Sequence, residues 1–94
     1  MTSALPPAHW VPALPPDVRV RKMRGRLLVA RRDESVQLED VSAAIFARID
    51  GTSSAEQIGQ ALCAQYEVDP PTAVADTVEF LGQLVELGIL DRGW

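Results

Sequence analysis

Residues 18–38 have the sequence VRVRKMRGRLLVARRDESVQL, and this stretch decides the fold. Apolar and charged residues alternate over residues 18–21, which is the pattern of a half-buried strand. Arg24-Gly25 predicts a tight turn, because glycine supplies the positive φ that such turns require. Residues 26–31 and 35–38 are two further expected strands. The stretch therefore predicts a three-stranded antiparallel meander.

The spacing of apolar residues becomes helical after the third expected strand. Asp40 is the expected cap of a first helix, which ends at Gly51, a residue suited to the left-handed C-terminal position. Ser53 and Glu56 have the spacing of a capping box and predict the start of a second helix. Asp69-Pro70 predicts the start of a third helix, which extends to about residue 87. The result is an α+β fold, with a three-stranded antiparallel sheet followed by three helices.

Residues 1–17 precede the first strand and hold five of the seven prolines. Proline has no backbone N–H to donate, so this tract is not expected to form a helix or join a sheet. We predict a flexible or polyproline-like tail. In it Trp10 is more simply an idle aromatic side chain, with packing on the domain or on a partner as the alternative. The folded domain is expected to span residues 18–94.

The composition narrows the class of protein. A chain of 94 residues with 47% apolar residues can form one modest core. Its apolar runs, such as residues 27–30, are far shorter than the ~20 residues that a membrane span needs. We see no secretory signal and expect a cytoplasmic protein without a membrane partner. With Cys63 and His9 as the only cysteine and histidine, we expect no intramolecular disulfide and no zinc site.

Charge is distributed unevenly along the chain. The net charge is −4, yet seven of the nine basic residues lie in residues 19–32. Residues 33–94 contain twelve acidic residues and only two basic residues, Arg48 and Arg92. A basic front segment can bind nucleic acid or an acidic peptide, although solvation of one sheet face is the simpler interpretation. The seven basic residues are Arg19, Arg21, Lys22, Arg24, Arg26, Arg31 and Arg32.

No catalytic constellation is found. The six glycines form no phosphate-binding loop, and the single histidine lies in the proline-rich tail, away from any candidate serine or cysteine nucleophile. Asp76 and Glu79 lie on adjacent helical turns, where a solvated helix face is the simpler explanation. We therefore expect no catalytic residue, no cofactor and no metal, and we do not expect the domain to be an enzyme by itself.

The third expected helix carries two apolar stripes. One consists of Val74, Val78, Leu81 and Val85, and the other of Thr77, Phe80, Leu84 and Leu87. Together they are wider than the stripe that a surface helix normally buries. The extra apolar surface is either deeper core or an exposed groove for a partner, and the pattern alone favours core.

Several short segments resemble the PqqD family. They are VQLEDVSAAI (residues 36–45), IDGT (49–52), AEQI (55–58), VEFL (78–81) and LGIL (87–90). In that family a strand ending in Leu-Asn leads to a helix with a buried isoleucine, an Asp-Gly-Thr turn and a helix bearing Glu-x-Ile. The resemblance covers residues 18–91. Glu39 departs from it, since the family commonly has asparagine there, and a side-chain cap at this junction would have to come from Asp40 or Ser42.

The resemblance implies a winged-helix-like recognition element for ribosomally synthesised, post-translationally modified peptides. Such a domain binds the leader segment of a precursor peptide and presents it to a modifying enzyme, such as a radical-SAM enzyme, a cyclase or a leader protease. The leader is expected to add as a strand beside the third strand, in a groove against the third helix. The expected peptide-binding residues are Arg31, Arg32, Val36, Gln37, Leu38, Thr77, Phe80, Leu81 and Leu84.

These residues have three expected roles. Residues 36–38 pair with the leader backbone, the four residues of the third helix form a pocket, and Arg31 and Arg32 meet acidic leader residues. For Val36, Leu38 and Leu81, packing in the core is an equal alternative. The missing Leu-Asn and the proline-rich tail lead us not to assign the chain to quinone biosynthesis.

Two other functions remain alternatives. One is a winged-helix nucleic-acid binder, since the architecture is shared and the strands are basic. A recognition helix needs Lys or Arg, which residues 70–87 lack, so a nucleic-acid partner is not expected. The other is a protein-only adaptor subunit. We expect a monomer, or a weak homodimer formed by pairing of exposed strand edges.

Overall fold

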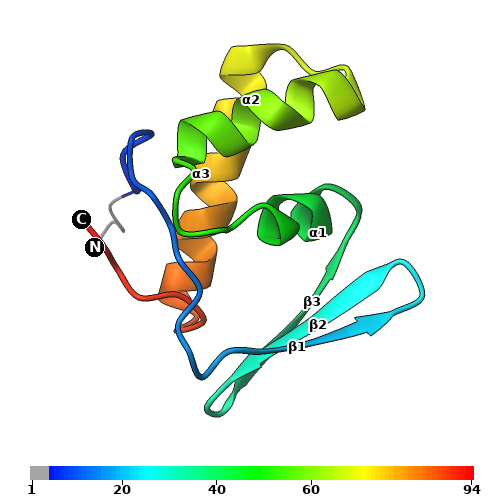
Figure 1. Cartoon of the computed structure of the whole chain (residues 1–94), viewed down its shortest axis with the longest axis vertical. Helices are drawn as coiled ribbons and strands as arrows, with labels where there is room; N and C mark the ends of the chain where they lie inside the picture. The colour runs from blue at the N-terminus through cyan, green and yellow to red at the C-terminus, as the bar shows by residue number, and fades with distance from the viewer. Residues whose placement is uncertain (1–4) are drawn as a thin grey trace.

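The computed structural model describes residues 5–94. Its elements are β1 (Arg19–Met23), β2 (Arg26–Arg31), β3 (Glu34–Glu39), α1 (Asp40–Ala47), α2 (Ala55–Tyr66) and α3 (Pro70–Glu86). The strands form one antiparallel sheet in the order β1-β2-β3, and the helices lie on one side of it (Figure 1). The predicted α+β fold, a three-stranded antiparallel sheet followed by three helices, is confirmed.

Side chains along each strand point alternately to the two faces of the sheet, and one of the two faces is buried. Leu27 and Val29 of β2 are buried, and Leu38 of β3 lies opposite Leu27 in the register. Val36 is half-buried and lies opposite Val29, so Val36 and Leu38 share the helix-facing side as expected. The first turn contains Gly25 at a φ of +65°, the left-handed conformation that the sequence required.

The junction between β3 and α1 differs from the prediction. Asp40 is the first helical residue rather than the cap, and the N-cap Glu39 makes no side-chain cap hydrogen bond. Ser42 does not cap the helix either, because its hydroxyl donates to the Glu39 carbonyl at 3.1 Å. The strand turns into the helix through Asp40 at a φ of +52°, which Asp tolerates better than most residues. The helix ends at Ala47, several residues before Gly51.

The capping box of α2 is displaced by one residue from the predicted Ser53–Glu56 pair. Ser54 Oγ accepts from the Gln57 N–H at 3.1 Å, and Gln57 Oε1 accepts from the Ser54 N–H at 2.8 Å. Ser53 instead belongs to the preceding turn, where its N–H and that of Thr52 donate to Asp50 Oδ1. These backbone hydrogen bonds lower the pKa of Asp50 to about 2.

Both ends of α3 follow the prediction closely. Asp69 is the N-cap and its carboxylate accepts from the Thr72 N–H at 3.4 Å, with Pro70 as the first helical residue. Gly88, at a φ of +86°, lies just after the helix. The chain then folds back, because the Ile89 N–H donates to the Leu84 carbonyl, and Ile89 and Leu90 are buried.

The core lies between the sheet and the helices. It consists of Leu27, Val29, Leu38, Ile45, Phe46, Ile49, Ala55, Ile58, Leu62, Val78, Leu81, Leu84, Ile89 and Leu90, together with Trp10. The α2 and α3 helices pack closely, and a Cβ at Gly59 would lie 2.8 Å from Val74 Cα. Glycine at this position therefore permits the approach of the two helices.

The prediction of a flexible tail with an idle Trp10 is wrong for the described part of the N-terminal segment, which packs on the domain. Trp10 is buried in the core cluster, and its carbonyl accepts from the Ala55 N–H at 2.8 Å, while the Ala8 carbonyl accepts from the Glu56 N–H at 2.9 Å. These carbonyls satisfy N–H groups at the start of α2 that have no partner within the helix. The segment runs beside the helices, next to the C-terminal residues (Figure 1). Residues 1–4 of the predicted tail lie outside the described residues.

Within residues 5–94, the longest helices are too short or too polar to cross a membrane. Over the same residues, no group of three or more His, Cys, Asp or Glu side chains is arranged to hold a metal ion.

Candidate functional site

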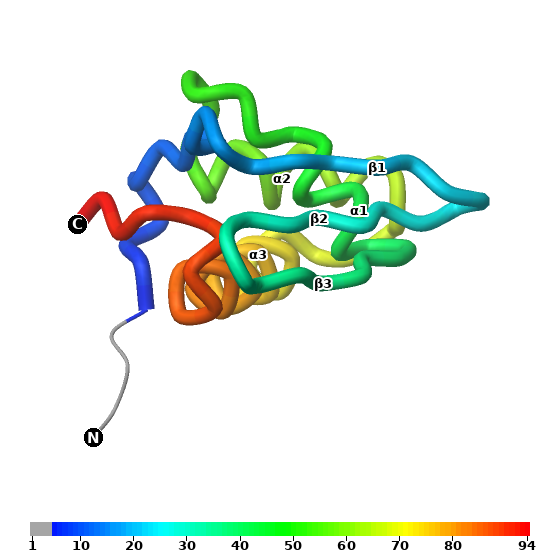
Figure 2. Tube along the Cα trace, turned by 90° about the horizontal axis from the view of Figure 1, so that it is seen from below, coloured from blue at the N-terminus to red at the C-terminus, as the bar shows by residue number. Residues whose placement is uncertain are grey.

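The outer edge of β3 is the first feature of the candidate site. β3 is the last strand of the sheet, so one row of its backbone N–H and C=O groups has no strand partner in the part of the chain that the structure describes. Figure 2 shows β3 at the border of the sheet, on the same side of the molecule as α3. Such an edge is a template for the addition of another strand.

Two of the predicted strand-pairing residues remain accessible. Gln37 is exposed, and its Nε2 donates to Glu39 Oε2 at a long 3.4 Å. Val36 is half-buried and packs against the core cluster. A strand added along this edge would therefore meet Gln37 on the side away from the helices and Val36 on the side that faces them.

Four predicted peptide contacts are core residues in this structure. Leu38, Leu81 and Leu84 are at most 3% exposed, and the side chain of Thr77 is fully buried. The Thr77 hydroxyl donates to the Ala73 carbonyl at 2.8 Å, so it has no hydrogen-bonding capacity that requires a ligand. Leu38, Leu81 and Leu84 support the site from behind and do not form its surface, whereas Thr77 also lines the crevice described below.

Phe80 is the predicted pocket residue that reaches the surface. It is half-buried and packs against the core cluster, one turn of α3 away from the buried Thr77 and Leu84. A partly exposed aromatic ring offers a large apolar contact area at low cost in conformational entropy. Phe80 therefore remains the best candidate for an apolar contact with a bound peptide.

The prediction that Arg31 meets acidic groups of a ligand is wrong, since Arg31 is only 6% exposed and its partners come from the chain itself. Its Nε donates to Asp17 Oδ1 at 2.8 Å, and its Nη1 donates to Asp91 Oδ1 at 2.9 Å and to the Gly88 carbonyl at 3.2 Å. These hydrogen bonds to Asp91 and Asp17 raise the pKa of Arg31. The Arg31 hydrogen bond in turn lowers the pKa of Asp17.

Arg32 is the predicted basic residue that stays available. Its side chain is 72% exposed, and its Nε lies 3.8 Å from Asp17 Oδ2, a loose ion pair in water. It occupies the turn between β2 and β3 at a φ of +56°. A charged group of a ligand that runs along β3 could reach it there.

A small apolar crevice at the other end of β3 was not predicted. It measures about 70 Å³ and is lined by Val41, Ile45, Leu62, Tyr66, Val68, Ala73, Asp76 and Thr77. Val41 is the second residue of α1, close after the end of β3, and is 40% exposed. The signal that could have identified it is its position, since the first turn of a helix that follows an edge strand lies beside that edge.

The comparisons with known proteins agree with this architecture. Residues 25–90 match the family described as "Coenzyme PQQ synthesis protein D (PqqD)". A "PqqA binding protein" of Xanthomonas euvesicatoria pv. vesicatoria is 31% identical over 84 residues, which are 87% of this chain and 91% of that protein. The "Bifunctional coenzyme PQQ synthesis protein C/D" of Methylorubrum extorquens is also 31% identical, and the chain spans 23% of its length.

Two solved structures have the same fold. The solution structure of the PqqD truncation of Methylobacterium extorquens PqqCD, described as a stand-alone recognition element for ribosomally synthesised and modified peptides, superposes with a TM-score of 0.80. It is 29% identical and covers 96% of this chain and 97% of that chain. Lasso peptide synthetase B1, complexed with the leader peptide, gives a TM-score of 0.78 at 25% identity, covering 88% and 100% of the two chains. By its sequence match, its three-stranded sheet and its three helices, the chain belongs to the PqqD family.

Proposed function

We propose that the chain binds the leader segment of a ribosomally synthesised precursor peptide by strand addition along the outer edge of β3. The observation that carries this proposal is the free edge of β3, which lies on the same side of the molecule as α3 and has the crevice at Val41 near its end (Figure 2). The half-buried Phe80 on α3 is the apolar side chain that we assign to the leader. The proposal is supported by the similarity to a PqqA binding protein and to the structure of a lasso peptide synthetase complexed with its leader peptide.

Backbone hydrogen bonds and apolar side chains of the leader would contribute differently to the binding free energy. About four strand-addition hydrogen bonds at roughly 0.5–1.5 kcal/mol each are largely offset by the cost of ordering the peptide. Burial of one leucine or phenylalanine of the leader adds ~1.5–3 kcal/mol. Backbone pairing would therefore fix the orientation, and apolar side chains at Phe80 and in the crevice would supply most of the affinity.

In this role the chain acts by binding and not by catalysis, in the cytoplasm, and hands the peptide to a modifying enzyme. That enzyme is a radical-SAM enzyme, a cyclase or a leader protease in our proposal. Gln37 pairs with the leader, Val36 supports it from the helix-facing side, and Arg32 meets an acidic leader residue at the β2–β3 turn. Leu38, Thr77, Leu81 and Leu84 hold this surface in place from the core.

The test is a titration of isotopically labelled protein with a synthetic peptide that has the leader sequence of the precursor encoded beside this gene. We expect amide shifts confined to residues 34–41 and 73–84, and an affinity about tenfold weaker for Phe80→Ala, which corresponds to loss of one apolar contact. Thermal melts of both proteins show how much stability the substitution removes.

Val85→Ala is the matched control for this substitution. Val85 is also half-buried on α3 and packs against the same core, but it lies on a different face of the helix. It should lower thermal stability by a similar amount and leave the affinity unchanged. If both variants lose affinity in step with stability, or if the shifts appear along β1, the proposed site is wrong.

A further inference from the structure

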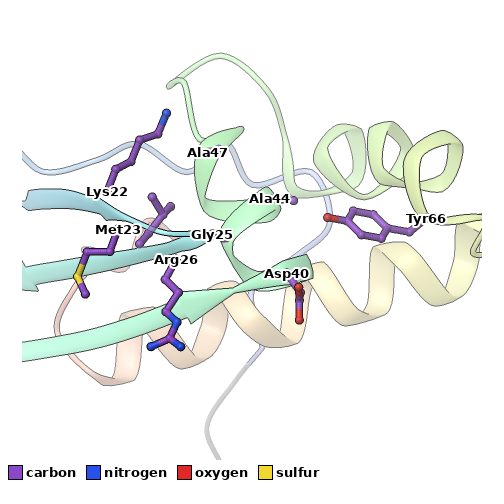
Figure 3. Close-up of a pocket in the computed structure, with 10 residues that line it drawn as sticks. Lys22, Met23, Gly25, Arg26, Asp40, Ala44, Ala47 and Tyr66 are labelled. Carbon is purple, nitrogen blue, oxygen red and sulfur yellow. The ribbon is translucent and has the colours of Figure 1, made fainter.

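A second open surface lies between the turn end of the β1–β2 hairpin and α1. The end of the β1–β2 hairpin and the neighbouring α1 line a shallow groove of about 460 Å³ (Figure 3). One wall is formed by the hairpin residues Lys22, Met23, Gly25, Arg26 and Leu27. The other is formed by Asp40, Ala43, Ala44 and Ala47 of α1, with Tyr66 of α2 at the end. The groove is wide because its helical wall consists mainly of alanines.

The helix layer does not cover β1. Val20 lies opposite Val29 in the register, so both side chains point to the same face of the sheet. Val29 is fully buried, whereas Val20 is 46% exposed. Met23 at the end of the strand pairs with Arg26 on the other face of the sheet and is 44% exposed. The α1 helix packs on β2 and β3, and the inner face of β1, which carries Val20 and Lys22, therefore remains open.

The groove also carries unbalanced positive charge. Residues 18–32 contain seven basic residues and no acidic one. Within residues 5–94, ion pairs of these basic residues involve only Arg31 and Arg32, so the five on the hairpin are not neutralised. Figure 3 shows Lys22 and Arg26 on the hairpin, with Asp40 as the acidic residue among the lining side chains. An occupant of complementary chemistry would be acidic and would carry small apolar side chains.

We propose that this groove is a docking site for an acidic, amphipathic segment of a second protein. Its apolar side chains fill the space between Ala44, Ala47 and Met23, and its carboxylates meet Lys22 and Arg26. A nucleic acid would satisfy the charge but not the apolar wall of alanines. A protein segment satisfies both features.

The docking site is separate from the proposed peptide edge. β2 lies between β1 and β3, so the groove and the β3 edge can be occupied at the same time. An adaptor that holds a peptide on one edge and an enzyme on the other needs this separation. The inference goes beyond the proposed function and does not depend on it, since no residue of β3 lines the groove; Tyr66 lines both the groove and the crevice beside β3.

The experiment is a titration of the labelled full-length protein with a synthetic amphipathic peptide of glutamate, alanine and leucine. The same peptide with lysine in place of glutamate is the charge control, and a short DNA duplex is the second probe. We expect shifts at residues 20–27 and 40–47 with the acidic peptide alone, and an affinity that falls as salt is added. Residues 34–38 of β3 should not shift.

Two substitutions test the chemistry. Lys22→Glu should weaken binding about tenfold, because a like charge replaces an attractive one, and Ala47→Gln should block the groove while preserving helix propensity. Arg48→Glu is the matched control, since Arg48 is an exposed basic residue outside the groove. Thermal melts should show that all three variants remain folded.

The proposal is overturned if the acidic peptide causes no shifts, if its shifts fall on β3, or if Arg48→Glu weakens binding as much as Lys22→Glu. Equal or tighter binding of the duplex at residues 19–26 would assign the basic hairpin to nucleic acid instead. A failure of leader binding at β3 would not change any of these results, so the two proposals can fail independently.

Discussion

At the scale of single residues, Arg31 joins three parts of the chain. Strand alternation points it to the same side as Leu27 and Val29, where a charged side chain needs partners. Asp17 and Asp91 supply them, at 14 and 60 residues from Arg31 in the sequence. The alternation of β2 could have indicated that Arg31 points inward and Arg32 does not. The identity of the two acidic partners could not be predicted, because both lie in irregular segments whose path depends on the whole fold.

We predict that Arg31→Met lowers thermal stability at neutral pH and flattens the acid limb of the stability curve. The Arg31 hydrogen bond holds the pKa of Asp17 below its ordinary 3.8. A carboxyl with a lowered folded-state pKa adds stability that is fully present above its ordinary pKa and is lost as the pH falls through the folded value. Wild type therefore loses this contribution as the pH falls below about 3.8, whereas the variant lacks the part that Arg31 supplies and keeps only what the Asp17 backbone and Arg32 provide. Thermal melts between pH 2 and pH 7 measure the difference.

Arg32→Met is the control for this prediction. Arg32 has the same charge and neighbouring position, but its contact with Asp17 is long and exposed. Its melting temperature should change little at any pH. Equal effects of the two substitutions would mean that the Arg31 network does not stabilise the fold.

At the scale of elements, local signals gave the right helices and strands but not every boundary. The second strand and the start of α3 were placed to the residue, because alternation and the Asp-Pro cap are strong local signals. The capping box of α2 was displaced by one residue, since residues 53–57 contain two overlapping patterns and the Asp50 turn uses Ser53. The apolar stripes of α3 were recognised, yet which members are buried depends on the rotation of the helix against the sheet.

Two glycines within helices provide a test of how closely the elements pack. A Cβ at Gly59 would lie 2.8 Å from Val74 Cα and 3.0 Å from Val74 N, so α2 and α3 would have to separate. We expect Gly59→Ala to destabilise the protein by about 1–3 kcal/mol, despite a gain of up to ~1 kcal/mol in helix propensity. Denaturant unfolding gives the value.

Gly82→Ala is the matched comparison on α3. Its Cβ would meet Pro6 Cδ at 3.1 Å, a side-chain atom of the N-terminal segment rather than helix backbone. That segment can shift by a few tenths of an ångström, so the propensity gain should make the substitution neutral or slightly stabilising. If Gly82→Ala lowers the free energy of unfolding more than Gly59→Ala does, α3 packs more tightly against the N-terminal segment than against α2.

At the scale of the whole molecule, the N-terminal segment is part of the domain. The sequence suggested a free tail, because prolines exclude helix and ladder hydrogen bonds and no local pattern marks Trp10 as buried. Its burial arises from contacts with α2 and with the C-terminal residues, where the Trp10 and Trp94 rings lie 4.9 Å apart in an edge-on arrangement. Such long-range packing has no periodic signature in the sequence.

We expect Trp10→Ala to lower the free energy of unfolding by about 3 kcal/mol, the lower end for truncation of a buried tryptophan. Val11→Ala, at an exposed neighbouring position, should cost less than about 0.5 kcal/mol. Urea unfolding followed by far-ultraviolet circular dichroism measures both. A change of similar size in the two variants would mean that residues 8–15 add little to the stability of the domain.

The contact between Trp10 and Trp94 also determines which structural change the intrinsic tryptophan fluorescence of this protein reports. These are the two tryptophans of the chain, and both belong to the cluster where the N-terminal and C-terminal segments meet. Neither lines the crevice beside β3 or the groove at the end of the β1–β2 hairpin. Intrinsic fluorescence is thus an optical probe for the closure of the two segments on the domain, and a tryptophan-free ligand can occupy either surface without altering the emission spectrum.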